Sequence, residues 1–175
     1  FLSFSNFCNA TTFYSQGSVT PSTAGNWNTI RGGGGTTAVA GDFTAAGNLF
    51  VIQNSHSMTM SAAWTLGTAV NLKIESGGTL DPSNKALTVG GTTTIDASGT
   101  YTDGSNTGVN EFTGLVTING SWSTSNSTST GRYFFDAGIT NNATSSAFGT
   151  ATFQTNDQTL GGTTPFIFSD VITVT

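Results

Sequence analysis

The sequence predicts an all-β protein, a parallel β-helix (β-solenoid) with coils of about 22 residues and an aromatic N-terminal arm or cap. The first observation is a phrase that returns along the chain: two apolar residues separated by one residue, a short acidic or amide residue, then a corner rich in glycine and serine. Its second apolar residue recurs at steps of 22, 21 and 23, at Ile52, Ile74, Ile95 and Ile118. A fixed period of this size is typical of stacked repeats that each form one coil.

The second observation is the spacing of apolar residues inside each repeat. Leu72 and Ile74 alternate at period two, as do Val116 and Ile118, which places one face of a short strand in a core. No long segment keeps the apolar spacing of a helix, so we expect no helices. The corners are Gly-Gly, Ser-Gly, Asn-Gly and Asp-Pro, which suit tight turns. Because the dense leucine spacing of a leucine-rich repeat is absent, the pattern favours a parallel β-helix.

Along the chain, residues 1–24 lack the repeat and are predicted to form the arm or cap, and residues 25–175 form the β-solenoid domain. The first eight residues fit either the end of a signal peptide or a first strand. The four glycines of 32–35 predict a surface loop. Regular coils are expected from about 43 to 122, followed by a Ser/Thr/Asn loop at 124–130 and by strands that use Phe in place of Ile and Leu.

The three tryptophans and the single cysteine are predicted to be structural. Trp64 and Trp122 occupy apolar positions of the repeat and are expected in the core, and Trp27 is expected to cap the first coil. A sugar-stacking platform would need two or more aromatic side chains facing outward together. Cys8 permits no intramolecular disulfide and is expected to be a small buried residue.

Composition excludes two classes of partner. Only 7% of the residues are charged, four of them Lys or Arg, and the net charge is −5. A basic patch that neutralises phosphates cannot be assembled from so few cations, so we expect no nucleic-acid partner. No apolar run has the length needed to cross a bilayer, so no membrane insertion is expected.

Several segments resemble a known family. They are Gly25–Asn28, Val51–Met60, Leu72–Leu80 and Phe153–Gly162, and they are similar to the repetitive β-solenoid regions of secreted and cell-surface proteins of Bacteroidota, often exported by the type nine system. The resemblance covers residues 25–175. It implies export to the cell surface and use as a stalk, an adhesive surface or a scaffold.

A polar residue follows each recurring isoleucine, and these residues are expected to stack into a ladder about 4.8 Å apart. They are Gln53, Glu75, Asp96 and Asn119. Glu75 above Asp96 offers the oxygen ligands that Ca²⁺ takes. Amides and carboxylates at corners also bond backbone N–H groups and set turns. Because only two of the four are acids, we interpret the ladder as structural and expect no metal and no cofactor.

Candidate catalytic residues are few. Asp81 and Asp103 each follow an aligned apolar residue and would lie on one side of the solenoid, where paired carboxylates can hydrolyse glycosides. However, Lys73 and Lys85 are the only nearby bases, and Asp-Pro and Asp-Gly are ordinary turn dipeptides. We therefore interpret both acids as turn residues and expect their replacement by Asn to change no measurable property apart from charge. His56, the only histidine, is expected to be a solvated turn residue, so no catalytic residue is assigned and the chain is predicted not to be an enzyme.

Threonine pairs suggest a further alternative. An ice-binding solenoid presents flat threonine arrays, and four Thr-x-Thr triplets occur here, the last three nearly in phase. They are Thr100/Thr102, Thr128/Thr130, Thr150/Thr152 and Thr173/Thr175. Threonine is also a common filler of solvent-facing strand positions, and the loop at 124–130 interrupts the array.

These observations predict a non-enzymatic extracellular structural or adhesive module, secreted or held at a bacterial surface. The alternatives are a polysaccharide-binding or polysaccharide-cleaving β-helix and an ice-binding solenoid. The main expected partner is a second copy, in a head-to-tail filament, with surface glycans as a further candidate. Deleting residues 1–16 is expected to give monomers with an intact solenoid. The expected subunit interface comprises Phe1, Phe4, Phe7, Phe13, Tyr14, Val171 and Val174.

Overall fold

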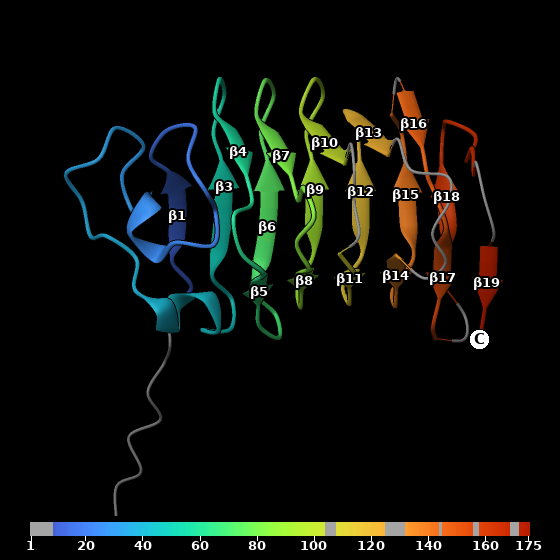
Figure 1. Cartoon of the computed structure of the whole chain (residues 1–175), viewed down its shortest axis with the longest axis horizontal. Helices are drawn as coiled ribbons and strands as arrows, with labels where there is room; N and C mark the ends of the chain where they lie inside the picture. Colours follow the sequence, from blue (N-terminus) through green and yellow to red (C-terminus); the bar gives the residue numbers. More distant parts are fainter. Residues whose placement is uncertain (1–8, 104–107, 125–131, 144, 156–157, 169–171) are drawn as a thin grey trace, which may run out of the picture.

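The computed structural model describes residues 9–103, 108–124, 132–143, 145–155, 158–168 and 172–175. It confirms a parallel β-solenoid, in which the chain winds through three sheets and each regular coil adds one strand to each of them (Figure 1). The described residues contain two short 3-10 helices, η1 (Ala24–Asn26) and η2 (Ala40–Phe43). Phe1, Phe4, Phe7, Cys8, Val171 and most of the predicted 124–130 loop lie outside the described residues.

Sheet A has eight strands in the order β18-β15-β12-β9-β6-β3-β1-β2. They are β1 (Thr12–Ser15), β2 (Trp27–Asn28), β3 (Leu49–Ile52), β6 (Asn71–Ile74), β9 (Thr93–Ile95), β12 (Val116–Ile118), β15 (Ile139–Asn141) and β18 (Leu160–Gly162). Sheet B is built of β4 (Ser57–Thr59), β7 (Thr79–Asp81), β10 (Thr100–Asp103), β13 (Ser121–Thr124) and β16 (Ser145–Ala147). Sheet C is built of β5 (Trp64–Leu66), β8 (Leu87–Val89), β11 (Asn110–Phe112), β14 (Tyr133–Phe135), β17 (Ala151–Phe153) and β19 (Ile172–Val174).

The core consists of columns of side chains that stack from coil to coil. The predicted isoleucine column is confirmed: Ile52, Ile74, Ile95 and Ile118 oppose one another in register and all are fully buried. In sheet B the inward column runs Met58, Leu80, Tyr101 and Trp122. Both Trp64 and Trp122 are core residues, as predicted. In-register pairing therefore buries apolar residues and joins the backbones of successive coils at the same time.

Aromatic rings take over the core in the later coils. Phe135 stacks between Phe112 and Phe153, with ring centroids 5.6 Å apart on each side. Trp122 stacks on Tyr101 at 4.0 Å and on Phe148 at 5.6 Å. Offset stacking of this kind adds about 0.5–1.5 kcal/mol per pair beyond the area that it buries. The larger rings fill a core in which isoleucine and leucine have become scarce.

The corners after the isoleucines repeat one backbone geometry. Ser55, Gly77 and Ser98 occupy successive coils with φ of 65°, 76° and 64°. Ser55 donates its N–H to the carbonyl of Gly77, and Gly77 donates its N–H to the carbonyl of Ser98. At Gly120 a side chain has no room, because a Cβ would lie 2.2 Å from the Gly99 carbonyl oxygen.

The N-terminal end of the solenoid is closed by its own chain. β1 pairs in parallel with β3, and β2 pairs antiparallel with β1 and so ends the ladder. Trp27 is fully buried and stacks on Trp64 at 5.5 Å, which agrees with its predicted capping role. Phe13 stacks on Phe50 at 5.2 Å. The described part of the predicted arm is therefore the first layer of sheet A.

The position of β1 bears on the expected effect of deleting residues 1–16. Deleting residues 1–16 would remove β1 and expose the edge of β3, together with the ring of Phe50 that Phe13 covers. We therefore expect such a truncation to destabilise the solenoid, because it uncovers both apolar surface and unpaired N–H and C=O groups.

The isoleucine column can be tested with one charged substitution. Ile95→Asp places a carboxylate between Ile74 and Ile118, so we expect the free energy of unfolding to fall by at least about 3 kcal/mol, measured by urea denaturation. Thr94→Asp is the matched control, because Thr94 is the neighbouring half-exposed residue on the outer face of β9, opposite Lys73. Equal stability of Ile95→Asp and the parent would show that the register is wrong.

Candidate functional site

The structure contains the predicted corner ladder, which is held by ion pairs and by hydrogen bonds of side-chain amides. Backbone hydrogen bonds link each coil to the one before. The first runs from Glu75 N–H to the Ile52 carbonyl, and the last runs from Asn142 N–H to the Ile118 carbonyl. Asn142 therefore extends the predicted series, and its Nδ2 donates to Asn119 Oδ1 at 3.0 Å. Gln53 Nε2 donates to the carbonyls of Ser15 and Arg31. The ladder thus ties neighbouring coils together at one corner.

Both acids of the ladder are paired with cations. Arg31 meets Glu75 in a bidentate ion pair, with N–O distances of 2.7 and 2.5 Å, and also lies 4.4 Å over the Tyr14 ring. Asp96 accepts from Lys73 at 2.9 Å. Hydrogen bonds from Arg31 lower the pKa of Glu75, although burial opposes the shift. The described residues contain no group of three His, Cys, Asp or Glu that is arranged to hold a metal ion.

The two candidate catalytic acids have different surroundings. Asp81 is the half-buried last residue of β7, and its Oδ1 accepts the Ser83 N–H at 2.7 Å, so it bonds the turn that follows, in agreement with its predicted role. Asp103 is not a turn residue, and that interpretation is wrong. It is the fourth residue of β10, and strand alternation after Tyr101 turns its side chain inward, where it is 1% exposed. A polysaccharide in solvent cannot reach a carboxylate buried in this way.

Asp103 belongs to a buried polar cluster that sequence reasoning missed. Its Oδ2 accepts the hydroxyl hydrogen of Tyr133 and, at 3.5 Å, the amide of Asn110. Burial raises the pKa of Tyr101 well above its usual value, and the nearby Tyr133 and Asp103 add to the shift. Asn110 stands in register between Leu87 and Tyr133, at a core position. Asp103→Asn therefore changes a buried hydrogen bond and is not the silent substitution expected from the sequence.

His56 is half-buried rather than solvated, so the expected environment is wrong. Its Nδ1 lies 2.7 Å from Ser15 Oγ and accepts the Gly17 N–H at 3.2 Å. A serine hydroxyl at this distance from an imidazole has the geometry of a nucleophile and its base. Here, however, Ser15 is completely buried and also accepts the Gln53 N–H at 3.0 Å. We assign the pair a structural role. The partners are 41 positions apart in the sequence, so sequence analysis does not reveal the pair.

The described threonine triplets are divided between two sheets. Thr100 and Thr102 lie on the outer face of sheet B, whereas Thr152 lies in sheet C, is 8% exposed and opposes the exposed Thr173. Thr128 and Thr130 lie outside the described residues. The last two triplets, Thr150/Thr152 and Thr173/Thr175, meet in sheet C but are offset by two residues, because Thr152 and not Thr150 opposes Thr173.

Sheet B nevertheless carries a regular array of hydroxyl groups. The outward positions form two columns in register, and we call this surface the hydroxyl face. One column is Ser57, Thr79, Thr100 and Ser121, and the other is Thr59, Asp81, Thr102 and Ser123. All eight are exposed or half-exposed, and Asp81 is the one charged member. Within the described part of the chain, no hydrogen bond to protein engages the seven hydroxyl groups.

The last coil exposes residues that face inward. Leu160 opposes Ile139, while Ile172 and Val174 oppose Ala151 and Phe153. Leu160 and Ile172 are each 47% exposed and Val174 is 74% exposed, whereas their partners in the preceding coil are buried. We call the surface of Leu160, Ile172 and Val174 the open coil.

The expected interface residues have different environments. Phe13 is buried in its own coil, so its ring is not available to a second copy. Tyr14 is half-buried beneath Arg31, and Val174 belongs to the open coil. Phe1, Phe4, Phe7 and Val171 lie outside the described residues.

Comparison of the chain with protein-family models, curated proteins and solved structures finds no significant match to any of them. In the described residues, no helix is long and apolar enough to span a membrane. The class of protein is therefore the one that the fold itself defines, a parallel β-solenoid.

The Arg31–Glu75 pair predicts a pH-dependent contribution to stability. Glu75→Gln should cost about 1 kcal/mol at pH 7, a modest amount because half of the Arg31 side chain is exposed. Since the pKa of Glu75 is lowered in the folded protein, this contribution is present above the unfolded-state pKa and is lost as the pH falls through the folded-state pKa. Parent and variant should therefore converge in acid.

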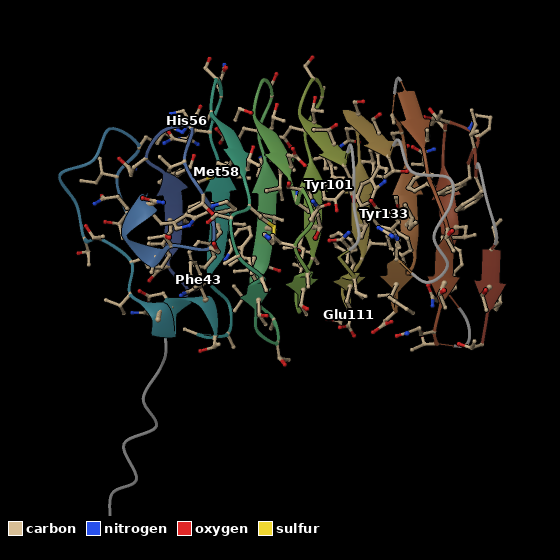
Figure 2. The ribbon with its side chains drawn as sticks, viewed as in Figure 1. Phe43, His56, Met58, Tyr101, Glu111 and Tyr133 are labelled. Carbon is tan, nitrogen blue, oxygen red and sulfur yellow. The ribbon has the colours of Figure 1, made fainter. Side chains whose placement is uncertain are left out.

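Urea denaturation at pH 7 and pH 3 measures this effect. Glu111→Gln is the control, because Glu111 lies on the outer face of β11 and has no ion pair among the described residues (Figure 2). A Glu75→Gln cost that is the same at both pH values would contradict the assignment.

Proposed function

We propose that this protein is a non-enzymatic structural or adhesive module of an exported bacterial surface protein, and that it associates with a second copy through the open coil. The observation that carries the proposal is the open coil, in which Leu160, Ile172 and Val174 face inward and yet are 47%, 47% and 74% exposed. Exposed apolar surface next to a strand edge favours association.

The body of the solenoid supports a mechanical role. Three continuous ladders join every coil to its neighbours along the rod (Figure 1). The surface is built mainly of hydroxyl and amide groups, with 7% charged residues in the whole chain. A repeat protein of this kind gains its stability from contacts between adjacent coils and presents a long, regular surface. The resemblance to Bacteroidota surface proteins supports the proposed location.

The geometry of the ends favours one mode of pairing. In sheet A the parallel ladder cannot be continued past the N-terminal end, because antiparallel β2 occupies that edge of β1. The outer face of sheet B carries hydroxyl groups that do not match an apolar surface. The surface most complementary to an open coil is the open coil of another copy, and such a contact is isologous and closes as a dimer. We propose this tail-to-tail arrangement as an alternative to the head-to-tail filament expected from the sequence.

The open coil predicts that the full chain dimerises and that two lysines prevent it. Ile172→Lys combined with Val174→Lys should convert dimers to monomers in light scattering, since the ammonium groups would be buried unpaired in the interface. Val39→Lys is the matched control, because Val39 is also exposed, at 64%, but lies beside the N-terminal cap. A parent chain that stays monomeric at high concentration, or a double variant that still associates, would contradict the proposal.

The hydroxyl face supports ice binding as a second candidate function. Its two columns repeat about every 4.8 Å along the solenoid axis, and members of one strand lie about 6.6 Å apart, two residues along it. A nearly uncharged, two-dimensional array of hydroxyl groups that do not bond to the protein can order water molecules in the same repeat. Asp81 is the one interruption.

Ice binding is tested by thermal hysteresis and by the shape of growing ice crystals. The parent should slow ice growth, and Thr100→Tyr with Thr102→Tyr should abolish the effect because the rings disrupt the regular surface. Thr117→Tyr is the control, since Thr117 is a half-exposed outward residue on β12 of sheet A. Absence of hysteresis in the parent, or equal activity of all three proteins, would exclude this function.

A further inference from the structure

The first regular coil presents three strand edges to the N-terminal cap, and the cap covers each of them in a different way. In sheet A the antiparallel strand β2 ends the ladder. In sheet C the Phe43 carbonyl at the end of η2 accepts the Gly67 N–H at 2.7 Å, and the Phe43 ring packs against Trp64. Sheet B begins with β4, which pairs with β7 on one side and with no described strand on the other. A strand edge of this kind is a template for pairing with another chain.

The backbone of β4 is divided between these two sides. The Met60 N–H, directly after β4, donates to the Asp81 carbonyl of β7 at 2.9 Å. Because the N–H groups of successive strand residues point in alternate directions, those of Ser57, Thr59 and Ser61 point away from β7 and toward the cap. These groups would bond the backbone of a further strand if one were added to sheet B.

Two side chains of the cap occupy this edge. The Ser57 N–H donates to Ser18 Oγ at 2.9 Å, and the Ser61 N–H donates to Thr20 Oγ1 at 3.1 Å. The Ser61 hydroxyl also donates to Thr20 Oγ1, at 3.1 Å. We call residues 17–23 the edge strap. Its hydroxyl groups take the place of the carbonyl acceptors that a neighbouring strand would supply.

The edge strap is fixed to the cap behind it. Asn26 Nδ2 donates to the Thr20 carbonyl at 2.8 Å, and Trp27 Nε1 donates to the Pro21 carbonyl at 2.8 Å. Trp27 is fully buried, so this second bond ties the strap to the core of the solenoid. A strand that added to β4 would have to displace both the hydroxyl acceptors and these ties.

The edge strap does not itself offer a new edge. Its residues form bends and turns and no strand. Gly17 has a φ of 114°, which is far from extended backbone, and Pro21 has no N–H to donate. The strap therefore ends sheet B without presenting the row of N–H and C=O groups that an added strand requires.

We propose that the edge strap is an autoinhibitory contact, in which Ser18 and Thr20 guard β4 against strand addition by a second copy of this chain. The strap blocks pairing because it satisfies the outward N–H groups of β4 with side chains that cannot continue a ladder. This inference goes beyond the proposed function and does not rest on it, since the strap lies at the opposite end of the solenoid from the open coil.

Hydrogen exchange tests whether the two hydroxyl groups hold the edge. In the parent chain the amides of Ser57 and Ser61 should exchange more slowly than their intrinsic rates. In Ser18→Ala combined with Thr20→Ala they should exchange about fivefold faster, the effect of losing one hydrogen bond at each amide. The Thr79 amide, which bonds β4 from the other side, should not change. Intrinsic exchange of both amides in the parent would overturn the proposal even if the variant does not fold.

Light scattering tests the guard function. The two alanine substitutions are made in a chain that carries Ile172→Lys and Val174→Lys, so that association through the open coil does not contribute. This variant should associate with increasing concentration, whereas the chain with the two lysines alone should stay monomeric.

Two controls separate the guards from a general effect on the cap. Ser18→Thr combined with Thr20→Ser keeps both hydroxyl acceptors and should stay monomeric. Thr44→Ala removes another cap hydroxyl, which bonds the Gly41 carbonyl and not β4, and should also stay monomeric. A monomeric double-alanine variant, or equal association of the variant and its controls, would show that the strap does not guard sheet B.

Discussion

The structure depends on in-register pairing between each coil and the next. A parallel strand satisfies its backbone groups only if a neighbour lies alongside, and its inward side chains are buried only if the coils above and below present apolar side chains at the same height. The isoleucine column meets both conditions at once, because Ile52, Ile74, Ile95 and Ile118 oppose one another and are fully buried. A shift of one residue in any coil would turn these side chains toward solvent.

This constraint explains why so few charged residues are tolerated and where they lie. Stacking places equivalent residues of successive coils about 4.8 Å apart, so columns of like charge would repel one another. The two acids of the corner ladder, Glu75 and Asp96, lie in successive coils, and their charges are compensated by Arg31 and Lys73. Where a polar group turns inward, as Asp103 does, the core supplies Tyr133 and Asn110 as donors. Amide and hydroxyl groups, which stack without repulsion, occupy much of the remaining surface.

The same constraint places the candidate functions at the ends and on one face. Unpaired strand edges and uncovered inward side chains favour association. Trp27, Phe13 and the antiparallel β2 cover the first coil, whereas Leu160, Ile172 and Val174 are exposed in the last described coil. Along the solenoid, the outward side chains repeat with the same spacing as the backbone that carries them. The hydroxyl face is therefore in register from coil to coil, as the core is. Self-association and contact with an ordered surface are both consequences of this repetition.

The sequence by itself determined the architecture, because the period of the isoleucines and the alternation within each repeat are local patterns. It also predicted the core positions of Trp64 and Trp122, the stacking of the corner ladder and the turn role of Asp81. It did not reveal partners that are distant in the chain, such as Ser15 with His56, Arg31 with Glu75, or Asp103 with Tyr133. β10 extends two residues beyond Tyr101, so Asp103 faces inward, whereas β7 ends one residue beyond Leu80. The Asp-Gly dipeptide predicts a turn at this point and does not reveal the longer strand. The closure of the N-terminal end and the alignment of the hydroxyl face were decided by the tertiary structure, because both depend on which residues of different coils are brought to the same height.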